Sequence, residues 1–288
     1  MNFIGEFLRE SKSQNKRGRC LHYAGGNRCN EIVSAHSIQN SGQLSLIAED
    51  GHVYRLSTDI ETLRKSGGLL QLKKIGVNKA STFLGFCKAH DNALFRPIDN
   101  FPLEPSKMQI ALYAYRCLCR EYFVKENAVR VMAKMKSHPA LSDDQRQLLE
   151  SIGLGNKIGF SGLAYHKFQY DQALTSLDYD CFEYVCFTST SLCNVQLSGL
   201  LYPDFDFNGS FLQDLRERHA PLNLITFFTA PMEDGWAFCF AWHTSSNKTC
   251  VPFIQSLAQQ VFSGMNPADA LLNFSLSCCE NHAIVLTK

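Results

Sequence analysis

Five cysteine and histidine side chains in the first hundred residues carry the clearest chemistry that this sequence offers. Four of them are potential zinc ligands, arranged as two pairs that flank a lone histidine, His36. The pairs are Cys20 with Cys29, and Cys87 with His90. A structural zinc site takes four tetrahedral ligands, usually Cys or His, often as two close pairs that the fold brings together. The sequence therefore predicts one Zn²⁺ ion held by these four residues.

The spacing within each pair bears on this prediction. Two residues separate the ligands of the second pair, so both can point at one ion from a turn that enters a helix. Eight residues separate the first pair, which is looser than the usual knuckle, but Gly25 and Gly26 allow a tight hairpin that brings the sulfurs together. The alternative is two unrelated pairs of buried thiols with a surface histidine. The polar residues and glycines around these cysteines favour zinc.

The order of these motifs resembles a known family. A cysteine pair is followed by Ala35-His36 at the end of a strand, and then by Phe-Cys87-Lys-Ala-His90-Asp91 opening a helix. Over residues 20–95 this resembles a treble-clef zinc finger and, more narrowly, the HNH (His-metal finger) nucleases. The resemblance implies a ββα unit around structural zinc, with His36 as general base and Asp91 holding a divalent ion such as Mg²⁺ at the scissile phosphate.

Three departures from the family keep a second interpretation open. Ala35 stands where the family commonly has an acidic residue, and about fifty residues separate His36 from the second ligand pair. The central asparagine of the family is not assigned, with Asn40 and Asn78 as candidates. A non-catalytic module, stapled by zinc and binding nucleic acid or protein, would keep the same four ligands.

Three regions are expected to position these residues. Residues 1–100 form the zinc-binding, HNH-like domain, and Pro102 and Pro105 mark its boundary. Its expected strands are 31–36, 52–56 and 69–77, followed by a helix that stops near Pro97. Before them, the first ten residues read as a short amphipathic helix and not as a secretion signal.

Residues 101–178 are expected to be a helical segment. Apolar residues recur at three- and four-residue spacing over 106–136, which predicts a long amphipathic helix. Ser142 and Gln145 match a capping box that opens a second helix, 143–152. The glycine-rich stretch 153–159 indicates a helix stop and loop, before another helix around 162–176.

Residues 179–288 are expected to form an α+β domain with an antiparallel sheet, so the fold class of the whole chain is α+β. Residues 235–243 alternate large aromatic with small apolar side chains, which predicts a strand covered on both faces. The other expected elements are strands at 182–190, 195–202 and 222–229, and helices at 251–262 and from 267.

Charge and cysteine content suggest partners and compartment. Residues 1–100 hold 14 Lys+Arg and 9 Asp+Glu, or +5, and the remainder holds 14 and 18, or −4. A basic, metal-organised region is suited to binding nucleic acid, although a solvated basic segment without a partner explains the charge equally well. No stretch approaches the roughly 18 apolar residues of a membrane span. The twelve cysteines do not form a disulfide-like pattern, and Cys181, Cys186 and Cys239 lie in apolar runs, so reduced thiols and a cytoplasmic location are expected.

The combination of a nuclease-like module with an unfamiliar second domain is similar to bacterial defence effectors, by analogy alone. An apolar sheet and a long helix are also compatible with a protein partner or self-association.

Overall fold

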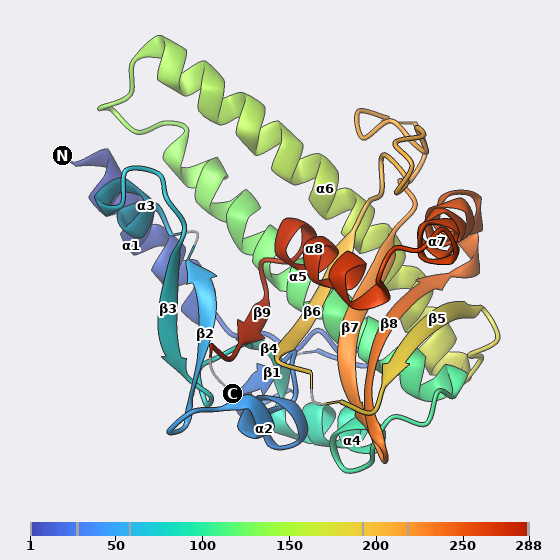
Figure 1. The fold of residues 1–288 in the computed structure, drawn as a ribbon. Coiled ribbons are helices and arrows are strands. Elements are labelled where there is room, and N and C mark those ends of the chain that lie inside the picture. Colours follow the sequence, from blue (N-terminus) through green and yellow to red (C-terminus); the bar gives the residue numbers. More distant parts are fainter. Residues whose placement is uncertain (1, 27–28, 58, 192, 218, 287–288) are drawn as a thin grey trace.

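A computed structural model describes residues 2–26, 29–57, 59–191, 193–217 and 219–286, and its fold is α+β as predicted (Figure 1). The strands are β1 (Ile32–His36), β2 (His52–Ser57), β3 (Gln71–Gly76), β4 (Thr82–Cys87), β5 (Phe182–Ser189), β6 (Val195–Leu201), β7 (Ile225–Met232), β8 (Gly235–His243) and β9 (His282–Ile284). The helices are α1 (Phe3–Lys16), α2 (Ser45–Ile47), α3 (Ile60–Lys65), α4 (Lys88–Asp99), α5 (Lys107–Met135), α6 (Asp143–Ser176), α7 (Asn247–Phe262) and α8 (Pro267–Cys278), with a π-helical turn η1 (Asn40–Leu44) and a 3₁₀ turn η2 (Thr244–Ser246).

The large antiparallel sheet has the strand order β3-β2-β9-β6-β7-β8-β5, and its strands β6, β7 and β8 are covered on both faces. Figure 1 shows α5 and α6 behind the sheet and α7 and α8 in front of it. On β8 the small residues Ala237, Cys239 and Ala241 belong to the core shared with α5 and α6. Phe238 and Phe240 point the other way, into the core formed with α7 and α8. The prediction of a doubly covered strand is therefore confirmed.

Helix α5 lies at the centre of the molecule. Every residue from Gln109 to Cys119 is buried, so the first half of this helix is enclosed on all sides. It packs against the sheet through β6 and β7, and against β4 and α4 on its other side. The smaller β1–β4 sheet therefore shares its core with the large sheet by way of α5.

The loop predicted at residues 153–159 is wrong, because α6 runs unbroken from Asp143 to Ser176. The predicted capping box at Ser142 is present and starts this helix. A glycine in a helix costs about 1 kcal/mol, a penalty that packing along a neighbouring helix can offset. A Cβ at Gly153 would lie 3.6 Å from Met132 of α5, and one at Gly159 would lie 3.6 Å from Lys125, which are ordinary van der Waals distances, and one at Gly155 would meet no atom within 4 Å. The three positions are therefore compatible with an unbroken helix packed along α5.

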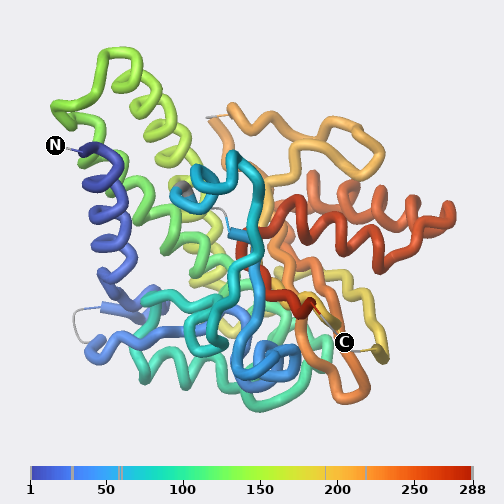
Figure 2. The backbone as a smooth tube through the Cα atoms, turned by 60° about the vertical axis from the view of Figure 1, so that its left-hand side comes forward, coloured from blue at the N-terminus to red at the C-terminus, as the bar shows by residue number. Residues whose placement is uncertain are grey.

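The hairpin β2–β3 belongs to the same sheet as the C-terminal strands. Tyr54 of β2 pairs with Ile284 of β9, which in turn pairs with Val195 of β6. Figure 2 shows this part of the chain running beside the C-terminal end. The roughly fifty residues between His36 and Cys87 thus leave the small sheet, extend the large sheet and return.

The expectation of reduced thiols needs one correction. Cys186 and Cys239 are directly paired across β5 and β8 and form a disulfide. The sequence places both in apolar runs, and only the register of the two strands brings them together. The other ten cysteines are free. In the described part of the chain, no helix is both long and apolar enough to cross a membrane.

Candidate metal centre and adjoining cavity

The four predicted zinc ligands meet at the junction of β4 and α4. Cys87 is the last residue of β4 and the N-cap of α4, and His90 lies in the first turn of that helix. Cys20 is held beside them by the backbone on either side of it. The Arg19 N–H donates to Leu84 O at 3.0 Å, and the Leu21 N–H donates to Gly85 O at 2.8 Å.

The turn between the first two cysteines depends on Gly25. Its N–H donates to His22 O at 2.6 Å, and a Cβ at this position would lie only 2.7 Å from that oxygen. After the turn, the Gly26 N–H points at the Cys29 sulfur at 3.4 Å. The two sulfurs are brought together as predicted, by a turn at Gly25 rather than by paired strands in the described part of this segment.

The ligand atoms are spaced as one tetrahedral ion requires. The Sγ atoms lie 3.4, 3.4 and 3.3 Å from Nδ1 of His90, and all four ligand atoms lie within 4.8 Å of one another. Bonds of about 2.3 Å to sulfur and 2.0–2.1 Å to nitrogen give an S···N separation of about 3.5 Å at the tetrahedral angle. The cluster of Cys20, Cys29, Cys87 and His90, hereafter the Cys₃His cluster, can therefore hold a metal ion such as zinc.

The surroundings of the Cys₃His cluster orient the His90 ring and shift the pKa values of the groups in and beside the cluster. The His22 ring stacks on His90 at 4.0 Å between centroids and 4° between planes, and burial lowers the pKa of His22 to about 4. Burial raises the pKa of the Cys20 thiol to about 11, whereas the backbone N–H of Gly26 lowers the pKa of Cys29. Metal binding would release the thiol protons, so its affinity is expected to rise with pH.

Arg19, one of the basic residues that lead into the first cysteine, holds the fold together. It forms an ion pair with Glu126, donates to the carbonyl oxygen of Phe123 at 3.2 Å, and lies over the Phe123 ring at 4.2 Å. All of these partners lie on α5. Arg19 therefore anchors the cysteine turn to α5 and contributes no free charge to the surface.

The two residues predicted to be catalytic line a single cavity of about 410 Å³. His36 is the last residue of β1, and Asp91 follows His90 in the first turn of α4. The two asparagine candidates also line it, and the Asn40 side chain donates to Asn78 at 3.0 Å. The topology thus joins residues that are up to 55 positions apart in the sequence, from His36 to Asp91.

The hydrogen bond of His36 determines which of its nitrogens is free. Nε2 lies 3.2 Å from Val77 O, and since a carbonyl only accepts, Nε2 carries the proton. In the neutral ring, Nδ1 then keeps its lone pair and can accept a proton. Burial is the largest influence on His36 and lowers its pKa, which favours this neutral form at neutral pH.

An ion pair forms the wall of the cavity between β1 and α4. Arg116 of α5 donates twice to Asp99, at 2.8 and 2.7 Å, and lies over the Phe95 ring at 4.1 Å. The Arg116 side chain is 4% exposed. Burial raises the pKa of Asp91, and no hydrogen bond to its carboxylate occurs among the described residues. Because Arg116 and Asp99 neutralise each other, the cavity is not basic.

The cavity does not hold a ready-made three-ligand metal site. Across the described residues, the Cys₃His cluster is the only group of three or more His, Cys, Asp or Glu side chains close enough to share one ion. A divalent ion held at Asp91 would need water or substrate oxygens to complete its coordination.

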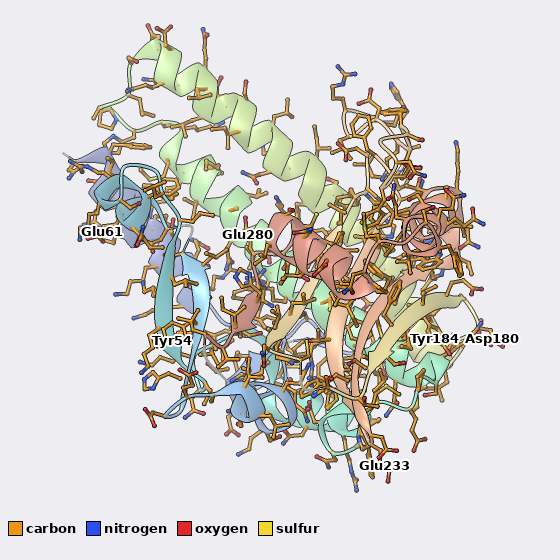
Figure 3. The ribbon with its side chains drawn as sticks, viewed as in Figure 1. Tyr54, Glu61, Asp180, Tyr184, Glu233 and Glu280 are labelled. Carbon is orange, nitrogen blue, oxygen red and sulfur yellow. A yellow bond between two sulfur atoms is a disulfide. The ribbon has the colours of Figure 1, made fainter. Side chains whose placement is uncertain are left out.

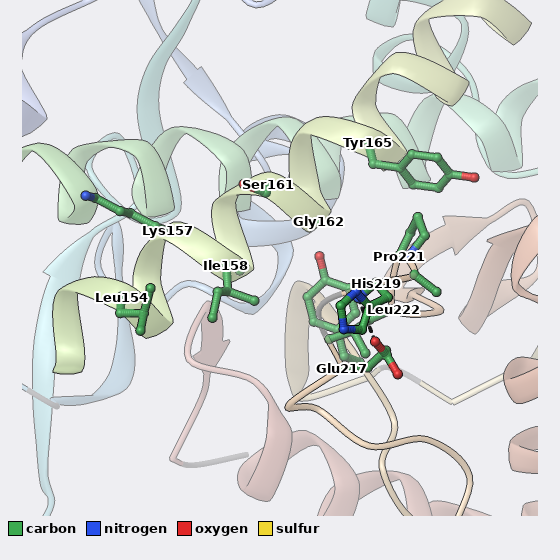
Figure 4. A pocket seen from close by; sticks show the side chains of 13 residues that line it. Leu154, Lys157, Ile158, Ser161, Gly162, Tyr165, Glu217, His219, Pro221 and Leu222 are labelled. Atoms are coloured by element: carbon green, nitrogen blue, oxygen red, sulfur yellow. Dashed lines mark hydrogen bonds between the residues drawn. The ribbon is translucent and has the colours of Figure 1, made fainter.

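A second cavity, of about 470 Å³, lies between α6 and the loop 203–222, remote in sequence from the Cys₃His cluster. Figure 4 shows Tyr165 and Ile158 of α6 on one side and Glu217, His219 and Pro221 of the loop on the other. Tyr202 packs so tightly against α6 that a Cβ at Gly162 would lie 2.8 Å from its hydroxyl.

Sequence reasoning missed Arg116 and Asp99 as part of the first cavity. One signal was available: Arg116 interrupts the apolar run Tyr115-Arg116-Cys117 within the predicted amphipathic helix 106–136. A buried arginine needs an anionic partner, but the sequence alone does not identify which carboxylate supplies it.

No protein-family model, curated protein or solved structure matches this chain.

Proposed function

We propose that this protein is a metal-dependent nuclease of the HNH type, stapled by structural zinc, that hydrolyses nucleic-acid phosphodiesters in the cavity lined by His36 and Asp91. The observation that carries the proposal is that these two residues, 55 positions apart in the sequence, line one cavity beside the Cys₃His cluster. The strand pair β1–β4 followed by α4 is also the arrangement that a ββα finger requires.

His36 is suited to act as general base. Its Nε2–H bond to Val77 O orients the ring and leaves Nδ1 as the proton acceptor. In the proposed step, a water oxygen forms a bond to phosphorus while the bond from phosphorus to the leaving oxygen breaks. The water proton passes to Nδ1 of His36 and is later lost to solvent, and the leaving oxygen takes a proton from water.

Asp91 is suited to hold the divalent ion. Its carboxylate lines the same cavity, and oxygen ligands suit hard ions such as Mg²⁺. When bound, such an ion neutralises charge on the phosphate and on the leaving oxygen. The two ions have separate roles, since the Cys₃His cluster presents soft ligands and the cavity presents hard ones.

The alternative is a non-catalytic module that zinc staples and that binds nucleic acid or protein. The absence of a preassembled three-ligand cation site among the described residues favours this alternative. The two candidates differ only in whether His36 and Asp91 perform chemistry.

Cleavage assays separate the two functions. Wild type, His36→Ala and the control His219→Ala would be incubated with supercoiled DNA and with single-stranded RNA, in Mg²⁺ or Mn²⁺ and in EDTA. The control removes an exposed histidine that lines the second cavity and lies outside the His36 cavity. We expect cleavage by wild type and His219→Ala, a loss of about 100-fold or more in His36→Ala, and none in EDTA. Equal cleavage by wild type and His36→Ala would eliminate the proposed chemistry.

A further inference from the structure

A cationic segment extends from the His36 cavity along the edge of the large sheet. We define the basic arm as residues 52–79, which comprise β2, α3, β3 and the following turn. It contains six Lys and Arg residues and two Asp and Glu residues, or +4, whereas the whole chain is +1, so the rest of the chain sums to −3. The excess positive charge of the N-terminal region is therefore concentrated in this arm.

Most of the cations of the basic arm are free. Lys65 pairs with Glu61 at 2.6 Å, and Lys73 lies 3.8 Å from Asp59. The other four are exposed and form no ion pair within the described part of the chain: Arg55, Arg64, Lys74 and Lys79. Arg19, in contrast, is fully engaged with α5.

The basic arm presents its cations along an open sheet edge. β3 is an edge strand that pairs only with β2 among the described strands, and residues 71–74 are all exposed. Lys74 is paired with Tyr54, so both side chains project from the same face of the hairpin. Figure 3 shows this hairpin at the margin of the molecule, with Tyr54 marking β2 and Glu61 marking α3. Its six-residue strands span about 20 Å.

The basic arm and the cavity are continuous. Val77 and Asn78 follow β3 directly and line the cavity, and Val77 O is the acceptor that orients His36. Lys79 is the next residue and is exposed. An anionic chain lying along the arm would therefore reach the cavity without crossing another element.

Charge identifies the occupant of this edge. Open edge strands can also pair with a second copy of the chain, and Leu69 and Leu70 at the tip are 68% and 53% exposed. Lysines on an edge strand oppose such pairing, because two copies would bring like charges together. A polyanion has the opposite charge and gains affinity by releasing counterions.

We propose that the basic arm binds the sugar–phosphate backbone of a nucleic acid and lays it across the His36 cavity. This inference rests on the proposed function, since it names the surface by which that substrate would be held. The arm contacts phosphates and so contributes affinity without reading sequence.

Binding in an inactive background tests the basic arm. In His36→Ala protein, the Lys74→Gln/Lys79→Gln pair would be compared with Lys136→Gln/Lys248→Gln, which removes two exposed lysines at the end of α5 and on α7. Anisotropy would be measured with a labelled 20-base-pair DNA duplex and a 20-nucleotide RNA from 0.05 to 0.3 M salt. Two lost phosphate contacts lower the duplex salt slope by about 1.8 and the affinity at 0.1 M salt by about 60-fold. The control pair is expected to change the affinity less than twofold.

Each outcome decides the matter. Loss with either nucleic acid in the first variant alone supports the basic arm. Equal loss in both variants, or no binding to either nucleic acid, overturns it. Unchanged affinity in the first variant also overturns it, and a change of oligomeric state in gel filtration would then assign β3 to a contact between copies. Failure of the proposed function is separate, because it appears as absent cleavage by wild type while the arm variant still loses binding.

Discussion

Replacing Cys87 with serine tests the metal centre most directly. The Cys87 side chain is 3% exposed, and its sulfur lies 3.3 Å from Nδ1 of His90. Serine keeps nearly the same size, but its hydroxyl does not ionise near neutral pH, so the site loses one of its three thiolates. The variant is therefore expected to bind less than 0.2 equivalents of zinc where wild type binds one, on the order of a fivefold loss.

The size of the effect on stability follows from linkage. Structural zinc sites bind with about 10–16 kcal/mol, and the middle of this range corresponds to a Kd of about 0.3 nM. At about 10 μM free zinc, such a site stabilises the folded state by about 6 kcal/mol. Wild type is expected to lose this amount on chelation, a large share of the roughly 5–15 kcal/mol that holds a domain folded.

The structural change caused by removing zinc is expected to be local. Phe86 and Phe95, on either side of Cys87, are fully buried in the core shared with α5, so β4 and α4 keep their packing without metal. After Leu21, no described residue up to Cys29 is buried, so the turn between Cys20 and Cys29 depends more on zinc. Trypsin cleavage between residues 16 and 30 should therefore increase on chelation, before the rest of the chain is digested.

The assay compares zinc content by elemental analysis, urea unfolding with and without chelator, and limited proteolysis. The control is Cys181→Ser, which removes a half-buried thiol outside the Cys₃His cluster. Cys87→Ser should be insensitive to chelator, and Cys181→Ser should respond like wild type. Undiminished zinc in Cys87→Ser, or identical chelator sensitivity in all three proteins, would refute the assignment of the ligands.

Three further predictions concern the turn, the sheet and the histidine. Gly25→Ala should weaken zinc binding at least about tenfold, measured in competition with a chromophoric chelator, because the added Cβ would lie 2.7 Å from the carbonyl oxygen of His22. Gly26→Ala is the control and should bind zinc like wild type, because a Cβ there would meet no atom within 4 Å. Gln43→Leu should lower the free energy of unfolding in urea by about 2–4 kcal/mol. The Gln43 side chain is 1% exposed and donates to Gln196 of β6 and Thr229 of β7, so its loss leaves buried hydrogen-bonding groups without a partner. A change below about 0.5 kcal/mol would contradict this. Burial lowers the pKa of His36 below its usual 6.5, so as the pH falls the unfolded state binds a proton at this histidine before the folded state does. The free energy of unfolding should therefore be highest above pH 6.5 and should decline as the pH falls toward the lowered folded pKa. His36→Gln should flatten this decline when urea titrations at pH 7.5 and 5.0 are compared.

Features decided by neighbouring residues could be predicted from the sequence. The spacing of Cys87 and His90 follows from the first turn of one helix, and the capping box at Ser142 needs only four consecutive residues. The alternation in β8 likewise reports burial on both faces of one strand. Each of these signals is complete within about ten residues, so no tertiary information is needed to interpret it.

Features decided by tertiary packing were missed or could not be predicted. The glycines at 153–159 indicated a loop, whereas the structure keeps them in a helix that packs along α5, a tertiary contact that the sequence does not show. The pairing of Cys186 with Cys239, which are 53 residues apart in the sequence, depends on the register between β5 and β8. The partner of Arg116 lies 17 residues upstream, on a helix whose orientation the sequence does not specify.

The long separation between His36 and Cys87 has a structural explanation that bears on the proposed chemistry. Directly after His36, Ser37 bonds to Ser81 on the returning chain and accepts a hydrogen bond from Asn281, beside β9. The intervening segment is also tied to the large sheet through Gln43. His36 is therefore positioned by contacts that reach the last ten residues of the chain, and not by the Cys₃His cluster alone. Because a general base must be held within hydrogen-bonding distance of its water, these contacts make the large sheet part of the support for the cavity rather than a separate attachment to it.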